Sequence, residues 1–99
     1  MSTNEILNII NNINSNSNIA KPIHYYLNGG CYIFAKQLQS LIGGNIRYLT
    51  LEHHFVTEIQ GKLFDTTGNV TNKYIKSKYI SEKEFNNRDK LRKGIKNFQ

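Results

Sequence analysis

With 99 residues, of which 38% are hydrophobic, the chain can form one compact domain with a small core, and we expect a single domain over residues 1–99. No apolar run is long enough to cross a bilayer, and no basic-then-apolar leader is present, so we expect a cytoplasmic protein without membrane contact. The single cysteine excludes an intrachain disulfide, and we expect no cofactor.

The net charge of +6 is confined to the C-terminal part of the chain. Residues 1–72 carry four basic and four acidic side chains, whereas residues 73–99 carry nine basic and three acidic ones. Such a segment is most often a solvated surface, but it can also bind nucleic acid or an acidic protein. The candidate partner-binding residues are Lys73, Lys76, Lys78, Arg88, Lys90, Arg92 and Lys93.

The first 18 residues predict a helix followed by a loop. Ser2 and Glu5 have the spacing of a capping box, and isoleucines and a leucine follow at helical spacing as far as Asn14. Residues 15–18 are a polar cluster typical of loops. Lys21 precedes a proline and marks a further break, after which the chain leads into two successive glycines.

The central part of the chain, residues 28–68, predicts one helix and about three antiparallel strands. The helix begins near Cys31 and ends at Gly43-Gly44, a pair suited to a left-handed exit. The strands span residues 46–51, 53–59 and 62–66, and Gln60-Gly61 predicts a two-residue hairpin turn. The expected fold is therefore α+β, with the helix packed on a small antiparallel sheet and with further helices at both ends.

The basic C-terminal segment, residues 73–99, is less clearly patterned. Apolar residues between positions 74 and 80 fit either a short helix or an edge strand. A second capping box at Ser81 and Glu84 predicts a helix to about Lys93.

Cys31 is the candidate nucleophile. It lies directly after two glycines and in the first turn of the predicted helix. The unpaired N–H groups and the positive end of the helix dipole at this position both favour the thiolate, which is the reactive form of cysteine. An inert cysteine of the core is the alternative interpretation.

The candidate base and acid are His54 and Asp65. Adjacent strand residues point to opposite faces, so only one of His53 and His54 can share a site with Cys31. A turn at Gln60-Gly61 would place Asp65 opposite position 56, on the same face as His54. An imidazole can take the thiol proton, and a carboxylate can orient and stabilise the imidazolium.

Acyl chemistry also needs donors for the developing oxyanion. The N–H of Cys31 is one candidate, and the amide of Asn28 beside the Gly29-Gly30 bend is another. Glycine at position 30 would let a substrate approach the backbone closely. A zinc site from His24, Cys31, His54 and Asp65 is conceivable, but the spacing of these residues is unlike that of zinc ligands, so no metal is expected.

Within residues 28–68, the stretches Gly29-Gly30-Cys31-Tyr32, His54-Phe55-Val56 and Gly61-Lys62-Leu63-Phe64-Asp65 resemble a minimal papain-like or transglutaminase-like core. They also resemble small papain-fold proteins from bacteria and phages. The resemblance implies a nucleophile at Cys31, a base at His54 and an orienting acid at Asp65. No glutamine precedes the cysteine at the usual oxyanion-hole distance, and the substrate-binding lobes of larger members are missing.

The predicted function is a thiol-dependent hydrolase or acyl transferase that acts on a peptide or side-chain amide. The sequence does not separate a protease, a deamidase and a transglutaminase. The alternative is a non-enzymatic binding or inhibitor module, such as a small phage counter-defence protein, that uses the basic segment to bind nucleic acid or an acidic protein surface.

Overall fold

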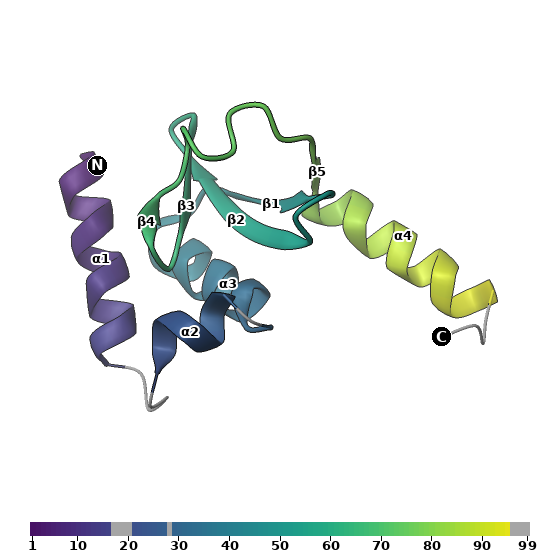
Figure 1. Ribbon diagram of the computed structural model, residues 1–99, viewed down its shortest axis with the longest axis horizontal. Coiled ribbons are helices and arrows are strands. Elements are labelled where there is room, and N and C mark those ends of the chain that lie inside the picture. The colour runs from purple at the N-terminus through teal and green to yellow at the C-terminus, as the bar shows by residue number, and fades with distance from the viewer. Residues whose placement is uncertain (17–20, 28, 96–99) are drawn as a thin grey trace.

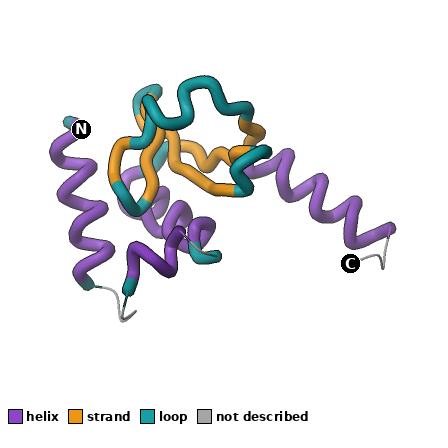
Figure 2. The backbone as a smooth tube through the Cα atoms, viewed as in Figure 1, coloured by secondary structure: helices purple, strands orange, loops and turns teal. Residues whose placement is uncertain are grey.

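The computed structural model describes residues 1–16, 21–27 and 29–95, with side chains as far as Arg88. Its centre is an antiparallel sheet of five strands in the order β4-β3-β2-β1-β5. Helices α1, α2 and α3 gather on one side of this sheet, and a long connection between β4 and β5 arches over the other (Figures 1 and 2). Helix α4 projects from the end of the sheet (Figure 1). The expected α+β class is confirmed.

Helix α1, Thr3–Ser15, begins at the predicted capping box. The Ser2 Oγ accepts a hydrogen bond of 3.1 Å from the Glu5 N–H, and the Ser2 N–H donates to the Glu5 carboxylate at 2.7 Å. Ile6 and Ile10 are buried on the inner face of the helix. Together, the cap and this apolar face account for the helix.

Helix α2, Pro22–Leu27, was not predicted. It has only six residues, which is too short for a clear helical period, and its proline occupies the first helical position, where the missing N–H costs nothing. Tyr26 is buried in the core, and the Tyr25 ring covers Gly30 so closely that a Cβ there would lie 2.3 Å from it.

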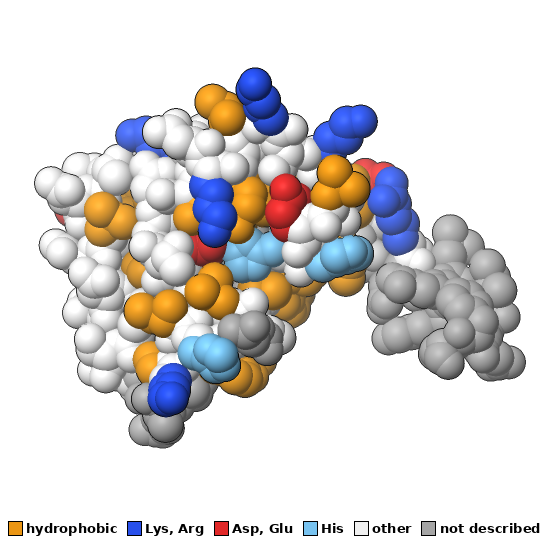
Figure 3. Space-filling view, viewed as in Figure 1, with side chains coloured by type: hydrophobic (Ala, Val, Ile, Leu, Met, Phe, Trp, Pro, Cys, Tyr) orange, Lys and Arg blue, Asp and Glu red, His pale blue; other side chains and the backbone are white. Residues whose placement is uncertain are grey.

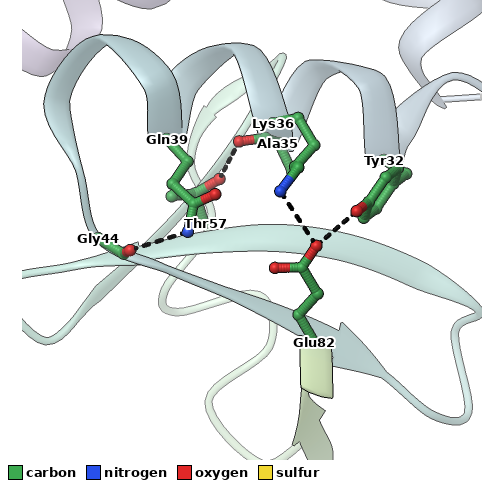
Figure 4. Close-up of polar contacts among 7 residues, drawn as sticks. All are labelled: Tyr32, Ala35, Lys36, Gln39, Gly44, Thr57 and Glu82. Atoms are coloured by element: carbon green, nitrogen blue, oxygen red, sulfur yellow. Dashed lines mark hydrogen bonds and ion pairs between the residues drawn. The ribbon is translucent and has the colours of Figure 1, made fainter. Parts of the chain in front are cut away.

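Helix α3, Cys31–Ile42, has the predicted bounds. It ends at Gly43 and Gly44, as predicted, and both have positive φ angles (83° and 90°), but the ψ of −152° at Gly43 differs from that of the expected left-handed cap. The helix packs on the sheet through Phe34, Ala35 and Leu38, all of which are buried. The Thr57 hydroxyl on the sheet donates to the Ala35 carbonyl at 3.3 Å (Figure 4).

The three central strands are β1 (Asn45–Leu49), β2 (His54–Ile59) and β3 (Lys62–Asp65). Gln60 and Gly61 have φ angles of 54° and 78°, the backbone needed for the predicted two-residue hairpin. The pairings Ile59↔Lys62, Glu58↔Leu63 and Thr57↔Phe64 confirm the predicted register. Strand β2 begins one residue later than predicted, because His53 has a φ of 53° and belongs to the preceding turn.

The expected count of about three strands is wrong, because two short edge strands extend the sheet to five. β4 (Gly68–Asn69) pairs with β3, and β5 (Tyr79–Ser81) pairs with β1. Strands of two and three residues have too few positions to show an alternating pattern. The undecided segment near residues 74–80 therefore contains a loop and the start of an edge strand.

Helix α4, Glu82–Ile95, starts at the second predicted cap, where the Ser81 Oγ accepts from the Glu84 N–H at 3.1 Å. Its first residue, Glu82, accepts a hydrogen bond from the Tyr32 hydroxyl at 2.5 Å and pairs with the Lys36 ammonium at 3.3 Å (Figure 4). Phe85 packs on Tyr48 and Phe55. These contacts fasten the base of α4 to α3 and the sheet.

Apolar side chains fill both faces of the sheet. The larger cluster joins α1, α2 and α3 to the sheet through residues such as Ile10, Tyr26 and Phe64. On the opposite face, Leu49, Val56, Leu63 and Val70 form a second cluster beneath Tyr74 of the β4–β5 connection. Within the described ranges, no helix is both long enough and apolar enough to cross a membrane.

Replacing Leu38 by alanine tests the main core. Leu38 is fully buried, and truncation of such a residue costs about 2–5 kcal/mol of unfolding free energy through lost transfer energy and the cavity left behind. Leu41 on the same helix is 62% exposed and supplies the matched control. Urea denaturation should show a large loss for Leu38→Ala and a small one for Leu41→Ala; equal losses would contradict the packing of α3.

Candidate active site

Cys31 is the first residue of α3 and is half-buried with a free thiol. Gly30 is buried and is the N-cap residue of the helix, and its carbonyl accepts from the Phe34 N–H at 3.1 Å. The His54 side chain and the backbone N–H groups of Phe55 and Tyr32 lie close enough to the Cys31 sulfur to lower the pKa of the thiol. The thiol thus lies where the start of α3 meets the start of β2.

His54 is the first residue of β2, and only 7% of it is exposed. Its Nε2 lies 2.9 Å from Oδ2 of Asp65, so Nδ1 is left as the ring nitrogen for Cys31. The ring of Tyr74 packs against the imidazole with 5.9 Å between ring centres. The histidine is therefore held between a sulfur, a carboxylate and an aromatic ring.

Asp65 is the last residue of β3, and only 3% of it is exposed. While Oδ2 faces His54, Oδ1 accepts from the N–H of Thr67 at 2.8 Å and from its hydroxyl at 2.5 Å. Both carboxylate oxygens therefore have partners, which compensates for burying the charge.

A clamp between two distant parts of the chain supports the turn beside Asp65. The Thr66 hydroxyl donates to the side-chain carbonyl of Asn14 at 2.8 Å, and the Asn14 amide donates to the Thr66 carbonyl at 3.1 Å. We call this pair of hydrogen bonds the Asn14–Thr66 clamp. It joins the end of α1 to the residue that follows the buried acid.

The three predicted catalytic residues, Cys31, His54 and Asp65, therefore come together from α3, β2 and β3. The hairpin register and the alternation of side chains along the strands place the histidine and the acid on one face of the sheet, as predicted from the sequence. His53 is not part of this group: its Nδ1 is hydrogen-bonded to the Tyr48 hydroxyl at 2.9 Å. The catalytic role of the three residues stays a prediction.

The electrostatics of the group favour an ion pair. Burial opposes ionisation of His54, but the hydrogen bonds and charges of Asp65 and Cys31 outweigh it and raise the pKa of the imidazole to about 9. Burial likewise opposes ionisation of Cys31, yet His54 and the backbone N–H groups of Phe55 and Tyr32 lower the pKa of the thiol. The pKa of Asp65 is also lowered despite burial, by His54 and Thr67.

The other predicted site residues fare differently. Asn28, the suggested oxyanion donor, lies outside the described residues. Within the described chain, no three histidine, cysteine, aspartate or glutamate side chains are placed to share a metal ion. Thr67, Tyr74 and Asn14 were not among the site residues predicted from the sequence. An aspartate two residues before a threonine is a signal for the Asp65–Thr67 turn, but no local pattern points to the other two.

The basic segment contributes two separate surfaces. Lys73, Lys76 and Lys78 are exposed on the β4–β5 connection. Arg88 is on α4 and pairs with Glu84 one turn earlier at 3.0 Å. The side chains of Lys90, Arg92 and Lys93 lie outside the described part of the chain.

The pH dependence of alkylation tests the ion pair. The reaction of Cys31 with neutral iodoacetamide should accelerate at a lower pH than that of an unperturbed thiol, whose pKa is about 8.5. In Asp65→Asn the imidazolium loses its partner anion, so the midpoint of the pH profile of alkylation should shift to higher pH. His53→Ala is the matched control and should leave it unchanged. An unshifted midpoint in Asp65→Asn would contradict the coupling.

The pH dependence of stability gives a second test. Between pH 6.5 and about 9, folded His54 keeps a proton that the unfolded histidine has lost, so its contribution to the unfolding free energy falls as pH rises. Folded Cys31 has a lowered pKa, so it loses its proton at a lower pH than the unfolded thiol does, and its contribution to the unfolding free energy rises with pH. The two contributions oppose each other in the wild-type protein.

Cys31→Ala removes the rising contribution but leaves His54 paired with Asp65. Relative to the wild-type protein, the unfolding free energy of this variant should therefore fall as pH rises from 6.5 toward 9. Urea denaturation at several pH values measures the difference. Parallel stability profiles for the two proteins would show that the thiol and the imidazole do not share a proton.

The comparisons with known proteins point to a phage family. A family model described as Phage YunG-like protein matches residues 6–99. No curated protein and no solved structure matches the chain. The match overturns the assignment to a papain-like or transglutaminase-like family, which depended on short motifs within residues 28–68, but it agrees with the expected phage or bacterial origin. The chain belongs to the Phage YunG-like protein family.

Proposed function

We propose that this protein is a thiol-dependent hydrolase or acyl transferase that acts on a peptide or side-chain amide. The observation that carries the proposal is the buried contact of 2.9 Å between His54 Nε2 and Asp65 Oδ2, with Cys31 close enough to the same imidazole for the two groups to shift each other's pKa. A nucleophile, a base and an orienting acid in this arrangement can perform acyl transfer whatever the family of the protein.

In the proposed reaction, the Cys31 thiolate attacks the carbonyl carbon of the amide. The carbonyl π electrons move to oxygen and form a tetrahedral oxyanion, which the N–H of Cys31 at the start of α3 would stabilise. The His54 imidazolium then gives its proton to the leaving nitrogen as the C–N bond breaks, and an amine or ammonia departs. The product is a thioester on Cys31 beside a neutral imidazole.

The second half of the reaction reverses these roles. Neutral His54 takes a proton from water or from an amine, whose oxygen or nitrogen attacks the thioester carbon. Collapse of this intermediate breaks the C–S bond and restores the thiolate and the imidazolium. Water gives hydrolysis or deamidation, and an amine gives transfer. Throughout, Asp65 orients the ring and stabilises its charged form.

A binding module is the second candidate, favoured by the projection of α4 away from the sheet (Figure 1). Such a module would use the basic segment and would not need the thiol. Binding to nucleic acid through phosphate contacts would weaken steeply with added salt. A Cys31→Ala variant with unchanged biological effect would favour this candidate over the enzyme.

Acylation by p-nitrophenyl acetate tests the enzymatic proposal. The wild-type protein should release p-nitrophenol in a burst and gain one acetyl group on Cys31, seen by intact-protein and peptide mass spectrometry. His54→Ala should slow acylation by roughly 10²- to 10⁴-fold, the usual worth of a positioned base.

His53→Ala is the matched control, because it removes the neighbouring imidazole that contacts Tyr48 instead of Asp65. It should acylate at the wild-type rate. If His54→Ala also acylates at that rate, the proposed base is wrong and the enzymatic proposal fails.

A further inference from the structure

We propose that the Cys31 site selects acyl donors that carry negative charge, and that Lys73, Lys76 and Lys78 produce this selectivity. The inference deepens the proposed function and rests on it, because it concerns the substrate of the same thiol. It assigns the three lysines of the β4–β5 connection to substrate recognition rather than to a separate binding surface.

The β4–β5 connection reaches the candidate site through two ring contacts. The Tyr74 ring lies 5.9 Å from the His54 ring, and the Lys73 ammonium lies 5.3 Å from the centre of the Tyr74 ring. This chain of contacts brings a fixed positive charge to a distance from the imidazole comparable to the Debye length of roughly 10 Å at 0.1 M salt. Figure 3 shows both basic and acidic side chains beside histidine on this face of the molecule.

Backbone hydrogen bonds hold the connection over the sheet. Its start is tied to β3 by the bond of 2.8 Å from the Val70 N–H to the Leu63 carbonyl, and its end is tied by the bond of 3.2 Å from the Thr50 N–H to the Lys78 carbonyl. Between these points, the Tyr74 carbonyl accepts from the Ser77 N–H at 3.0 Å. The lysines are therefore carried by a segment anchored at both ends.

The positive charge of this connection is not neutralised locally. Within the described part of the chain, none of the three lysines is in an ion pair. Two carboxylates lie beside the connection: Glu52 accepts from the Ser77 hydroxyl at 2.7 Å, and Glu58 lines a pocket with Tyr74 and Ile75. Among the side chains that the structure describes, the acids on the sheet and α4 have basic partners, as Glu58 does with Arg47 at 2.9 Å. With Glu58 paired to Arg47, three exposed lysines and Glu52 leave the connection with an excess of positive charge, and Lys73 is the lysine linked to the site through Tyr74.

An acidic peptide fits this arrangement better than a nucleic acid does. The thiol needs an acyl carbon, which a peptide backbone or a glutamine or asparagine side chain supplies and a phosphodiester does not. Aspartate and glutamate flanking that carbon would lie against the lysines while the amide reaches Cys31. The substrate class is therefore a protein segment rich in acidic residues.

Charged thiol reagents test the inference without a known substrate. Anionic sulfonatoethyl and cationic trimethylammonioethyl methanethiosulfonate both modify Cys31, and the rate ratio is normalised to that of N-acetylcysteine amide. We expect the anionic reagent to be favoured. In K73Q/K76Q/K78Q the normalised ratio should fall roughly tenfold at low ionic strength, and 0.5 M salt should remove most of the difference.

The matched control is K21Q/K62Q/K83Q, which changes the net charge equally but leaves the connection intact. It should keep a ratio close to that of the wild-type protein. An equal fall in both triple variants, or none in either, would overturn the inference. The pH profile with neutral iodoacetamide separates this result from failure of the proposed function. If Cys31 of the wild-type protein shows the pH profile of an ordinary thiol, the proposed enzymatic function is contradicted, whatever the charge selectivity.

Protection of Cys31 from alkylation by iodoacetamide shows whether the lysines bind an acidic peptide or a nucleic acid. A hexaglutamate peptide should slow alkylation of the wild-type protein and have little effect on K73Q/K76Q/K78Q. A thymidylate hexanucleotide serves as the nucleic-acid probe. Protection by the oligonucleotide and not by the peptide would overturn the inference and assign the lysines to nucleic-acid binding.

Discussion

The buried hydrogen bond between His54 and Asp65 is the interaction on which the site depends. A carboxylate that is only 3% exposed is stable as an anion only when its charge is compensated, and the imidazolium and Thr67 together provide this. Loss of one member of such a buried pair typically costs about 3–5 kcal/mol, because the other charge is left without its partner. The same pair raises the proton affinity of the imidazole, and the imidazolium in turn stabilises the thiolate of Cys31. The packing of the site and the pKa shifts of its residues thus share one source.

The surrounding elements each constrain one member of this group. The Asn14–Thr66 clamp fixes the turn that follows the acid, and Tyr74 covers one side of the imidazole. The ring of Tyr25 leaves no room for a side chain at position 30, directly before Cys31. The Glu82 carboxylate holds α4 against the residue that follows Cys31, through the Tyr32 hydroxyl. Helices that carry none of the three site residues therefore still constrain their geometry.

Much of the local structure could be predicted because its causes are local. Two positive φ angles at Gln60-Gly61 set the hairpin register, and alternation along two strands was then enough to choose His54 over His53. Contacts between distant residues gave no such signal: Asn14 and Thr66 are 52 positions apart. The two-residue β4 and the six-residue α2 are too short to be stable by themselves, and they form because tertiary packing stabilises them. The family assignment failed for a related reason. A cysteine, a histidine and an aspartate at suitable spacing indicate a type of chemistry, but they do not identify the family to which a chain belongs.

Cys31, His54 and Asp65 all fall within residues 31–65, a continuous stretch made of α3 and the first three strands. Neighbouring elements in sequence are also neighbours in space here, so bringing these side chains together requires only short chain closures, which favours rapid folding. Genetic recombination, which joins segments of DNA end to end, would carry Cys31, His54 and Asp65 together in a single exchange. A recipient sequence would then have to supply only the outer supports, such as an asparagine to hold the turn after the acid.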